Sequence, residues 1–156
     1  HSTEFMKTCE QPVIDLMPDQ QNAKLGGTLR LGLFRCMVAE HTKTEQAYKM
    51  HEICERHRHR YEFNNIYRKH FEESDMMFSG INPERDLVEI IELKKHPWFV
   101  AVQFHPEFVS RPNKPHPLFR DFIGAALKRQ KKTARLAVGK KCGLLSFNKY
   151  KSFKIR

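Results

Sequence analysis

The stretch that decides the fold begins at Trp98 and reads Trp98-Phe99-Val100-Ala101-Val102-Gln103-Phe104-His105-Pro106-Glu107-Phe108. Its first five residues are apolar, a run typical of a strand that is buried on both faces of a parallel sheet. Polar residues follow where that strand is expected to end. Because open α/β sheets carry their sites beyond the carboxyl ends of their strands, we expect a functional site here.

His105 and Glu107 are the candidate catalytic pair of this stretch. In an extended chain their side chains point the same way, with the two backbone positions roughly 6–7 Å apart. Pro106 fixes its own φ and favours extended geometry at His105. A carboxylate beside a histidine accepts a ring N–H and stabilises the imidazolium, as the orienting group of a catalytic triad does. The motif alone is weak, and no nucleophile stands next to it in the sequence.

Size and composition indicate one domain with a real core. The chain has 156 residues, of which 40% are hydrophobic and twelve are Phe. No apolar run approaches the ~20 residues that span a bilayer, so no membrane partner is expected. The start of the chain, His1 to Glu4, has no initiating Met and is no signal peptide, which predicts a chain cut in mid-sequence. Four cysteines without a Cys-x-x-Cys pair indicate reduced thiols in a cytoplasmic protein.

The formal net charge is +10 at pH 7, a value found in proteins that bind nucleic acids or other anionic surfaces. Much of the excess follows Ala126, in residues 128–132 and in Lys140-Lys141. A charge run near a terminus is most often a solvated tail. No aromatic residues are interleaved with these lysines to stack on bases. We therefore expect no nucleic-acid partner and interpret residues 131–156 as a basic C-terminal tail.

The patterns along the chain predict an α/β fold with several hairpins. Strands are expected at 13–17, at 28–34 with a continuation to 38, at 76–80, at 87–93 and at 98–102. Helices are expected at 44–54, 66–73 and 118–130, the last with an apolar stripe. A tight turn at 94–97 joins two of the strands in a hairpin that leads to His105.

Residues 56–60 read Arg-His-Arg-His-Arg and form the densest cationic cluster before the tail. Alternation along a strand puts the three arginines on one face and His57 and His59 on the other. The arginines suit a carboxylate or phosphate, because guanidinium binds both bidentately. Ion pairs with Glu55 and Glu62 are an equally good explanation. We expect no metal here, since further ligands are missing at diagnostic spacing and three arginines repel a dication.

Several stretches resemble the glutaminase domain of CTP synthases, a class I glutamine amidotransferase, and they occur in the order of that family. They are residues 1–5, 25–32, 55–64, 87–92 and 96–112. The most specific is Glu-Arg-His-Arg-His-Arg-Tyr-Glu-Phe-Asn at 55–64. The resemblance covers about residues 1 to 128. It implies a three-layer αβα, flavodoxin-like amidotransferase domain, of which residues 1–130 would be the C-terminal half.

The resemblance also implies roles for individual residues. In the family a cysteine attacks the side-chain amide of L-glutamine, a histidine acts as the base, and a glutamate orients the histidine. His105 matches the base and Glu107 the orienting residue. Glu4 and Arg60 match the glutamine-binding residues, and their charges suit the α-ammonium and α-carboxylate of that substrate. No cysteine of this chain lies in the Gly-x-Cys-x-Gly turn that presents a nucleophile.

Further expectations follow from the same resemblance. By this resemblance, Thr28 and Arg30 lie in the stretch that corresponds to the family's region for its GTP activator. Ammonia passes to a separate synthase domain, which uses ATP and Mg to aminate UTP, and the full-length proteins form homotetramers. The nucleophile, the front half of the glutaminase domain and the synthase domain all fall upstream of His1. We therefore expect no cofactor in this chain and no activity from it alone. The alternative is a truncated, non-catalytic interaction or regulatory fragment with a basic tail.

Overall fold

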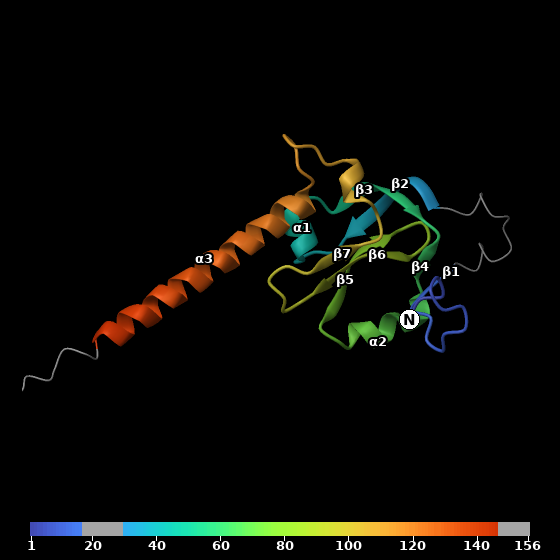
Figure 1. Cartoon of the computed structure of the whole chain (residues 1–156). Helices are drawn as coiled ribbons and strands as arrows, with labels where there is room; N and C mark the ends of the chain where they lie inside the picture. Colours follow the sequence, from blue (N-terminus) through green and yellow to red (C-terminus); the bar gives the residue numbers. More distant parts are fainter. Residues whose placement is uncertain (17–29, 147–156) are drawn as a thin grey trace, which may run out of the picture. The chain divides into compact units, whose positions relative to one another are not determined.

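A computed structural model describes residues 1–16 and 30–146 and shows an α/β chain built around one antiparallel sheet (Figure 1). The five strands of that sheet lie in the order β3-β2-β5-β6-β7. In chain order they are β2 (Arg30–Val38), β3 (Glu52–His59), β5 (Met76–Asn82), β6 (Leu87–Leu93) and β7 (Val100–Val102). A second, two-stranded sheet pairs β1 (Ile14–Leu16) with β4 (Tyr61–Phe63).

The helices are α1 (Lys43–Tyr48), α2 (Arg68–Glu72) and α3 (Pro117–Ser146), with single 3₁₀ turns at Asn65–Tyr67 and Pro106–Phe108. The chain divides into two compact units, His1–Arg120 and Asp121–Arg156. Both sheets, α1 and α2 belong to the first unit, and α3 begins in it. In the described part of the chain, no helix is long and apolar enough to cross a membrane.

The predicted helix at 44–54 is wrong beyond Tyr48. The helix ends at Lys49, which adopts a left-handed conformation with φ of 59° and donates its N–H to the Glu45 carbonyl. Residues Glu52–His59 then form β3, which pairs with β2 from Met37↔Glu52 to Arg30↔His59. The long ladder overrides a weak helical period, and Cys54 lies exposed on the strand rather than in a core.

The predicted hairpin into the His105 stretch is confirmed, but its last strand is not the expected kind. β7 pairs antiparallel with β6, from Glu92↔Val100 to Ile90↔Val102, and it is half-buried. The expectation of a parallel strand buried on both faces is therefore wrong. A tight turn can join only antiparallel neighbours, so the turn at 94–97 predicted the direction of β7 better than the apolar run did. Among the described strands, β7 pairs with β6 alone and forms one edge of its sheet.

The long helix α3 begins near its predicted start and continues well past residue 130. Only the first apolar residue of its stripe, Leu118, is buried. The stripe then runs exposed through Phe119, Phe122, Ile123 and Leu127. Leu118 therefore anchors the start of α3 in the core of the first unit, while an apolar face of the helix remains accessible.

The core of the first unit is small and leaves no room at Gly80. It is formed by seven buried residues: Cys36, Val38, Ala47, Ile53, Ile90, Phe104 and Leu118. Gly80 lies on β5 at a register shift against β6. A Cβ at this position would lie 2.5 Å from Ile90 Cγ1 and 2.8 Å from Cys36 Sγ. Glycine is thus required here by close packing, not by an unusual φ.

We predict that Gly80→Ala lowers the free energy of unfolding by about 1–3 kcal/mol, because the added methyl overpacks the core. Urea unfolding of the purified chain measures this. Gly124→Ala is the matched control: nothing lies within 4 Å of its added Cβ, and alanine favours helix by up to ~1 kcal/mol over glycine. Equal stability of the two variants would contradict the packing argument.

Candidate functional site

The structure brings His105 and Glu107 into direct contact at the end of β7. His105 Nδ1 lies 2.6 Å from Glu107 Oε1, and the two side chains are 35% and 56% exposed. His105 has φ of −111° and ψ of 88°, and Pro106–Phe108 forms a 3₁₀ turn instead of continuing the strand. The hydrogen bond from His105 lowers the pKa of Glu107. Because a carboxylate only accepts, the proton lies on Nδ1, and Nε2 carries the lone pair that a general base needs.

The backbone of His105 is fastened to the strand that carries the arginines. Its N–H donates to the Arg56 carbonyl over 2.9 Å. The His105 ring also stacks on Phe108, with centroids 4.9 Å apart and planes inclined by 19°. His105 is thus held from two sides, by the middle of β3 through its backbone and by its own turn through its ring.

The two predicted glutamine-binding residues, Glu4 and Arg60, belong to segments joined by the small sheet. Arg60 is the bend between β3 and β4, and β4 pairs with β1. Glu4 is exposed in a turn that follows Ser2, and Ser2 bridges Ile14 of β1. The small sheet therefore joins the segment that carries Glu4 to the strand that follows Arg60. Arg60 is half-buried, and its Nε is enclosed without a hydrogen-bond partner among the described residues.

Arg30 is not at the surface but in a buried cluster of charges. Its Nη2 makes an ion pair with Glu89 of β6, and its Nη1 lies 3.7 Å from Glu62 of β4. The guanidinium also lies over the Phe34 ring, 4.4 Å from the centroid. One cation serves two buried carboxylates, and burial raises the pKa of Glu62 to about 7 and raises that of Glu89. Thr28, its predicted companion for GTP, lies outside the described residues.

His57 and His59 point to the buried side of β3, as alternation predicted, while Arg56 and Arg58 are exposed. His57 Nδ1 lies 2.8 Å from His59 Nε2, and His59 Nδ1 lies 3.0 Å from the Tyr61 carbonyl oxygen. Burial, with Arg30 adding to it, lowers the pKa of His57 to about 3. Burial also lowers the pKa of His59 to about 4. Both rings are therefore neutral at pH 7.

The alternative of ion pairs with Glu55 and Glu62 holds only for His59, whose Nδ1 lies 3.4 Å from Glu62 Oε1; among the described residues neither glutamate pairs with Arg56, Arg58 or Arg60. Glu55 faces inward, where its Oε1 lies 2.9 Å from His116 Nε2 and accepts from the Tyr48 hydroxyl at 2.7 Å. Glu62 lies against Arg30 and His59 instead. The period of 2 already placed Glu55 on the histidine face, so this signal was present in the sequence.

Sequence reasoning also missed Glu89, which comes from β6 and joins the two histidines. Ligand atoms of His57, His59 and Glu89 lie within 4.8 Å of one another, so the third ligand that the sequence lacked is supplied by the fold. A cation there would compete with Arg30 for Glu89 and would break the bond between the two rings. These contacts favour a hydrogen-bonded cluster over a metal centre.

Cys36 is the most buried cysteine of the described residues and is unsuited to nucleophilic attack. Burial raises its pKa to about 12, so at neutral pH it is a thiol rather than a thiolate. It is a core residue that packs beside Gly80 and Ile90.

Comparison with known proteins places this geometry in a family. The model of the glutamine amidotransferase class-I family matches residues 6–125. The chain belongs to this family. It is 74% identical over 127 residues to a CTP synthase of Treponema denticola and 56% identical over 129 residues to one of Bacillus subtilis. These matches cover 81% and 82% of the chain but 24% of each relative, so the chain spans about a quarter of their length.

A solved structure agrees with these relatives. The glutaminase domain of Trypanosoma brucei CTP synthase, described with bound acivicin, superposes with a TM-score of 0.76 at 34% identity. The match covers 82% of this chain and 50% of that one. The expected class I glutamine amidotransferase fold is thereby confirmed, and the chain corresponds to part of the glutaminase domain of CTP synthases.

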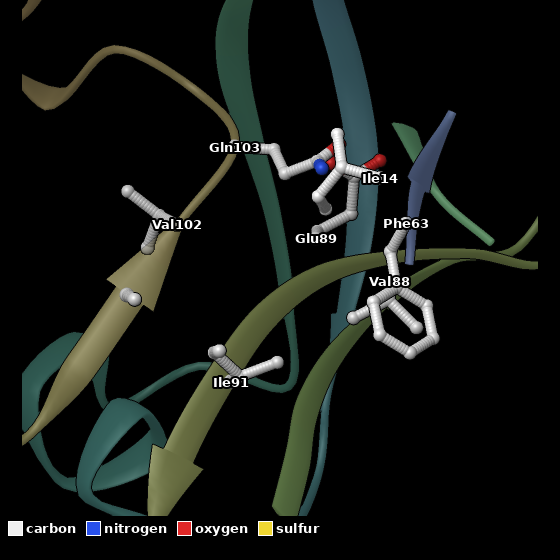
Figure 2. Close-up of a pocket in the computed structure, with 8 residues that line it drawn as sticks. Ile14, Phe63, Val88, Glu89, Ile91, Val102 and Gln103 are labelled. Atoms are coloured by element: carbon white, nitrogen blue, oxygen red, sulfur yellow. The ribbon is translucent and has the colours of Figure 1, made fainter. Parts of the chain in front are cut away.

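An apolar pocket of about 190 Å³ lies beside β7 in this amidotransferase fold (Figure 2). It is lined by eight residues: Ile14, Phe63, Val88, Glu89, Ile91, Ala101, Val102 and Gln103. Its only polar lining residues are Glu89, of the buried charge cluster, and Gln103, on the segment leading to His105. The pocket therefore lies over β6 and β7 and is bordered by Ile14 of β1 and Phe63 of β4.

The neutral, buried histidines predict a specific loss of stability in acid. Unfolded histidine takes up a proton below about pH 6.5, whereas folded His59 resists protonation until about pH 4. His59 therefore lowers the free energy of unfolding progressively as the pH falls from 6.5 towards 4. In the His59→Asn variant this fall should be smaller, by on the order of 2 kcal/mol.

Urea unfolding at several pH values between 7 and 4 measures that difference. Glu62 acts in the opposite direction, since its raised pKa costs stability as the pH rises from 4.5 towards 7, but it is present in both proteins. His41→Asn is the control, because His41 is exposed and its φ of 61° suits asparagine. The prediction fails if His59→Asn and His41→Asn show the same pH dependence.

Proposed function

We propose that His105 is the general base of a CTP synthase glutaminase and that Arg60 and Glu4 form part of its glutamine-binding site. The observation that carries the proposal is the 2.6 Å contact between His105 Nδ1 and Glu107, made by two accessible side chains. This contact leaves Nε2 of His105 ready to accept a proton. The match to CTP synthases at up to 74% identity supports glutamine as the substrate class.

In the proposed reaction, His105 Nε2 takes the proton of a cysteine thiol supplied by residues outside these 156. The thiolate attacks the side-chain amide carbon of glutamine, and His105 returns the proton to the departing ammonia. Water, activated by the same histidine, then hydrolyses the thioester to glutamate. Glu107 stabilises the imidazolium that forms in each half of the cycle and holds the ring in one tautomer.

Substrate binding falls to Arg60 and Glu4 in this proposal. Arg60 is half-buried and its Nε has no hydrogen-bond partner among the described residues, so its guanidinium has donor capacity that suits the α-carboxylate of glutamine. Glu4 would accept from the α-ammonium. The segment of Thr28 and Arg30 remains our candidate region for a GTP activator. Because the Arg30 guanidinium is already paired with Glu62 and Glu89, we assign it an indirect effect on that region.

The rest of the proposed enzyme must come from other segments. We propose that the other half of the glutaminase domain packs on the apolar pocket and extends the sheet along β7. The synthase domain would bind ATP, Mg and UTP, and the whole would assemble as a homotetramer in the cytoplasm. The 156 residues alone would then be inactive, because no cysteine with the required turn accompanies His105.

A chimera tests this function. In it, the present residues replace the matching part of the Treponema denticola CTP synthase. We expect His105→Ala to lower glutamine-dependent CTP formation at least ~100-fold, the usual effect of losing a general base. Ammonia-dependent CTP formation should not change, because free ammonia bypasses the glutaminase.

His70→Ala, a change of an exposed histidine on α2, should leave both rates unchanged and controls for general damage. Retention of glutamine-dependent activity in the His105→Ala chimera would refute the assignment. Separately, ammonia release from glutamine by the purified 156-residue chain would show that the proposed inactivity of the chain alone is incorrect.

A second candidate is a non-catalytic interaction role for the basic part of α3. Four exposed basic residues lie there, beyond the end of the family match at residue 125: Lys128, Arg129, Lys131 and Lys132. Their charge favours an acidic polypeptide as the partner.

Replacement of these four residues with Gln should abolish salt-sensitive retention of the chain on immobilised polyglutamate. Replacement of four exposed lysines of the first unit is the matched control; they are Lys49, Lys69, Lys94 and Lys95. If both quadruple variants lose retention equally, the binding reflects net charge, and the α3 surface has no specific role.

A further inference from the structure

We infer that His59 is a positioning residue for Arg60, holding the bend that aims the guanidinium at the glutamine carboxylate. This inference rests on the proposed function for its substrate, but its structural content can be tested without it. His59 is the last residue of β3 and Tyr61 the first of β4, so a bond from the His59 ring to the Tyr61 carbonyl spans Arg60.

The tautomer of His59 follows from its partners. Nδ1 lies 3.0 Å from the Tyr61 carbonyl oxygen and 3.4 Å from Glu62 Oε1. A carbonyl oxygen only accepts, so Nδ1 must carry the proton. In the neutral ring Nε2 is then an acceptor, and the group 2.8 Å away, His57 Nδ1, must donate to it. One directed chain of donors thus runs from His57 through His59 to the Arg60 bend.

The chain of donors begins beside the buried charge cluster, while the Tyr61 carbonyl at its other end sets its direction. His57 Nε2 lies 3.5 Å from Glu89 Oε2, and Glu89 is held by Arg30. Since His57 donates from Nδ1, its Nε2 has no proton in the neutral ring and faces Glu89 as an acceptor. The histidines titrate well below neutrality, so the order of donors persists at pH 7.

The same cluster holds the segment of His105, which gives the arrangement a function beyond stability. Gln103 N–H donates to the Glu89 carbonyl at 3.0 Å. With its amide oxygen accepting from the Phe63 N–H, the Gln103 side chain also donates its amide N–H to Glu62 Oε2 at 2.6 Å. The same buried cluster therefore contacts both the bend at Arg60 and the segment that leads to His105. This common support sets where the substrate lies relative to the base.

Two substitutions of His59 separate positioning from bulk packing. The amide of asparagine is attached to Cγ and overlays Nδ1, so His59→Asn keeps the donor to the Tyr61 carbonyl. The amide of glutamine reaches the Nε2 position, so His59→Gln keeps a partner for His57 and loses that donor. The two variants match in polarity, and each retains one of the two bonds.

Nuclear magnetic resonance of the 156-residue chain tests the structural content. Long-range ¹H–¹⁵N spectra should show His59 as the Nδ1–H tautomer at pH 7. The Arg60 Nε–H, which is enclosed, should remain ordered in wild type and His59→Asn, and its heteronuclear NOE should fall in His59→Gln. An Nε2–H tautomer, or equal Arg60 order in the two variants, would overturn the inference.

Kinetics of the chimera with the Treponema denticola enzyme test the consequence. KM for glutamine should rise about tenfold in His59→Gln, as expected for one lost hydrogen bond, and less than about threefold in His59→Asn. Ammonia-dependent kcat should stay unchanged in both. Arg60→Lys should also raise KM for glutamine, which shows that KM reports on this residue.

The outcomes distinguish the positioning role of His59 from the proposed glutaminase function. Equal KM in His59→Asn and His59→Gln, with Arg60→Lys still impaired, overturns the positioning role and leaves the proposed function intact. A wild-type chimera that makes CTP from ammonia but not from glutamine overturns the proposed function. In that case the tautomer and the order of Arg60 still decide whether His59 holds the bend.

Discussion

A single buried guanidinium, that of Arg30, is the constraint on which the first unit depends. Glu62 and Glu89 reach it from different strands, so β2, β4 and β6 meet at one point. Burying three charges is costly: burial raises the pKa of both carboxylates, although the nearby Arg30 guanidinium acts to lower them. Removing Arg30 would leave two buried carboxylates unpaired. The cluster is therefore better understood as fixing one arrangement of strands than as adding stability.

That fixed arrangement determines where the functional groups lie. The backbone N–H groups of Gln103 and His105 donate hydrogen bonds to the carbonyls of Glu89 and Arg56. These bonds fix the position of His105 relative to β6 and β3. Arg60 follows the same β3 after four residues. Because β3 connects these anchors, sheet geometry sets the distance between His105 and Arg60, and this is the preorganisation that the proposed reaction would require.

Sequence reasoning succeeded where the signal was local and failed where it was long-range. The shared face of His57 and His59 follows from spacing alone, whereas His105 meets Glu107 through a 3₁₀ turn in place of the extended chain that was expected. The partners of Arg30 do not, because Glu62 and Glu89 are brought to it by strand register, which no local period encodes. The helix expected through Cys54 failed for the same reason: residues 52–59 are a strand because β2 pairs with them. The resemblance to CTP synthases identified Arg60 and Glu4, which no pattern in the chain would have selected.

The place of His105 directly after an edge strand explains how a second segment could complete the proposed site. A general base must approach its nucleophile to about 2.6–3.2 Å. Among the described strands, β7 is paired with β6 on one side and unpaired on the other. A strand added there parallel to β7 would end at the same edge of the sheet as His105, so backbone hydrogen bonds would set the approach. Since Nδ1 of His105 is already committed to Glu107, the added segment would meet Nε2 with its lone pair free. His105 and Glu107 are thus already oriented without the segment that would carry the proposed nucleophile.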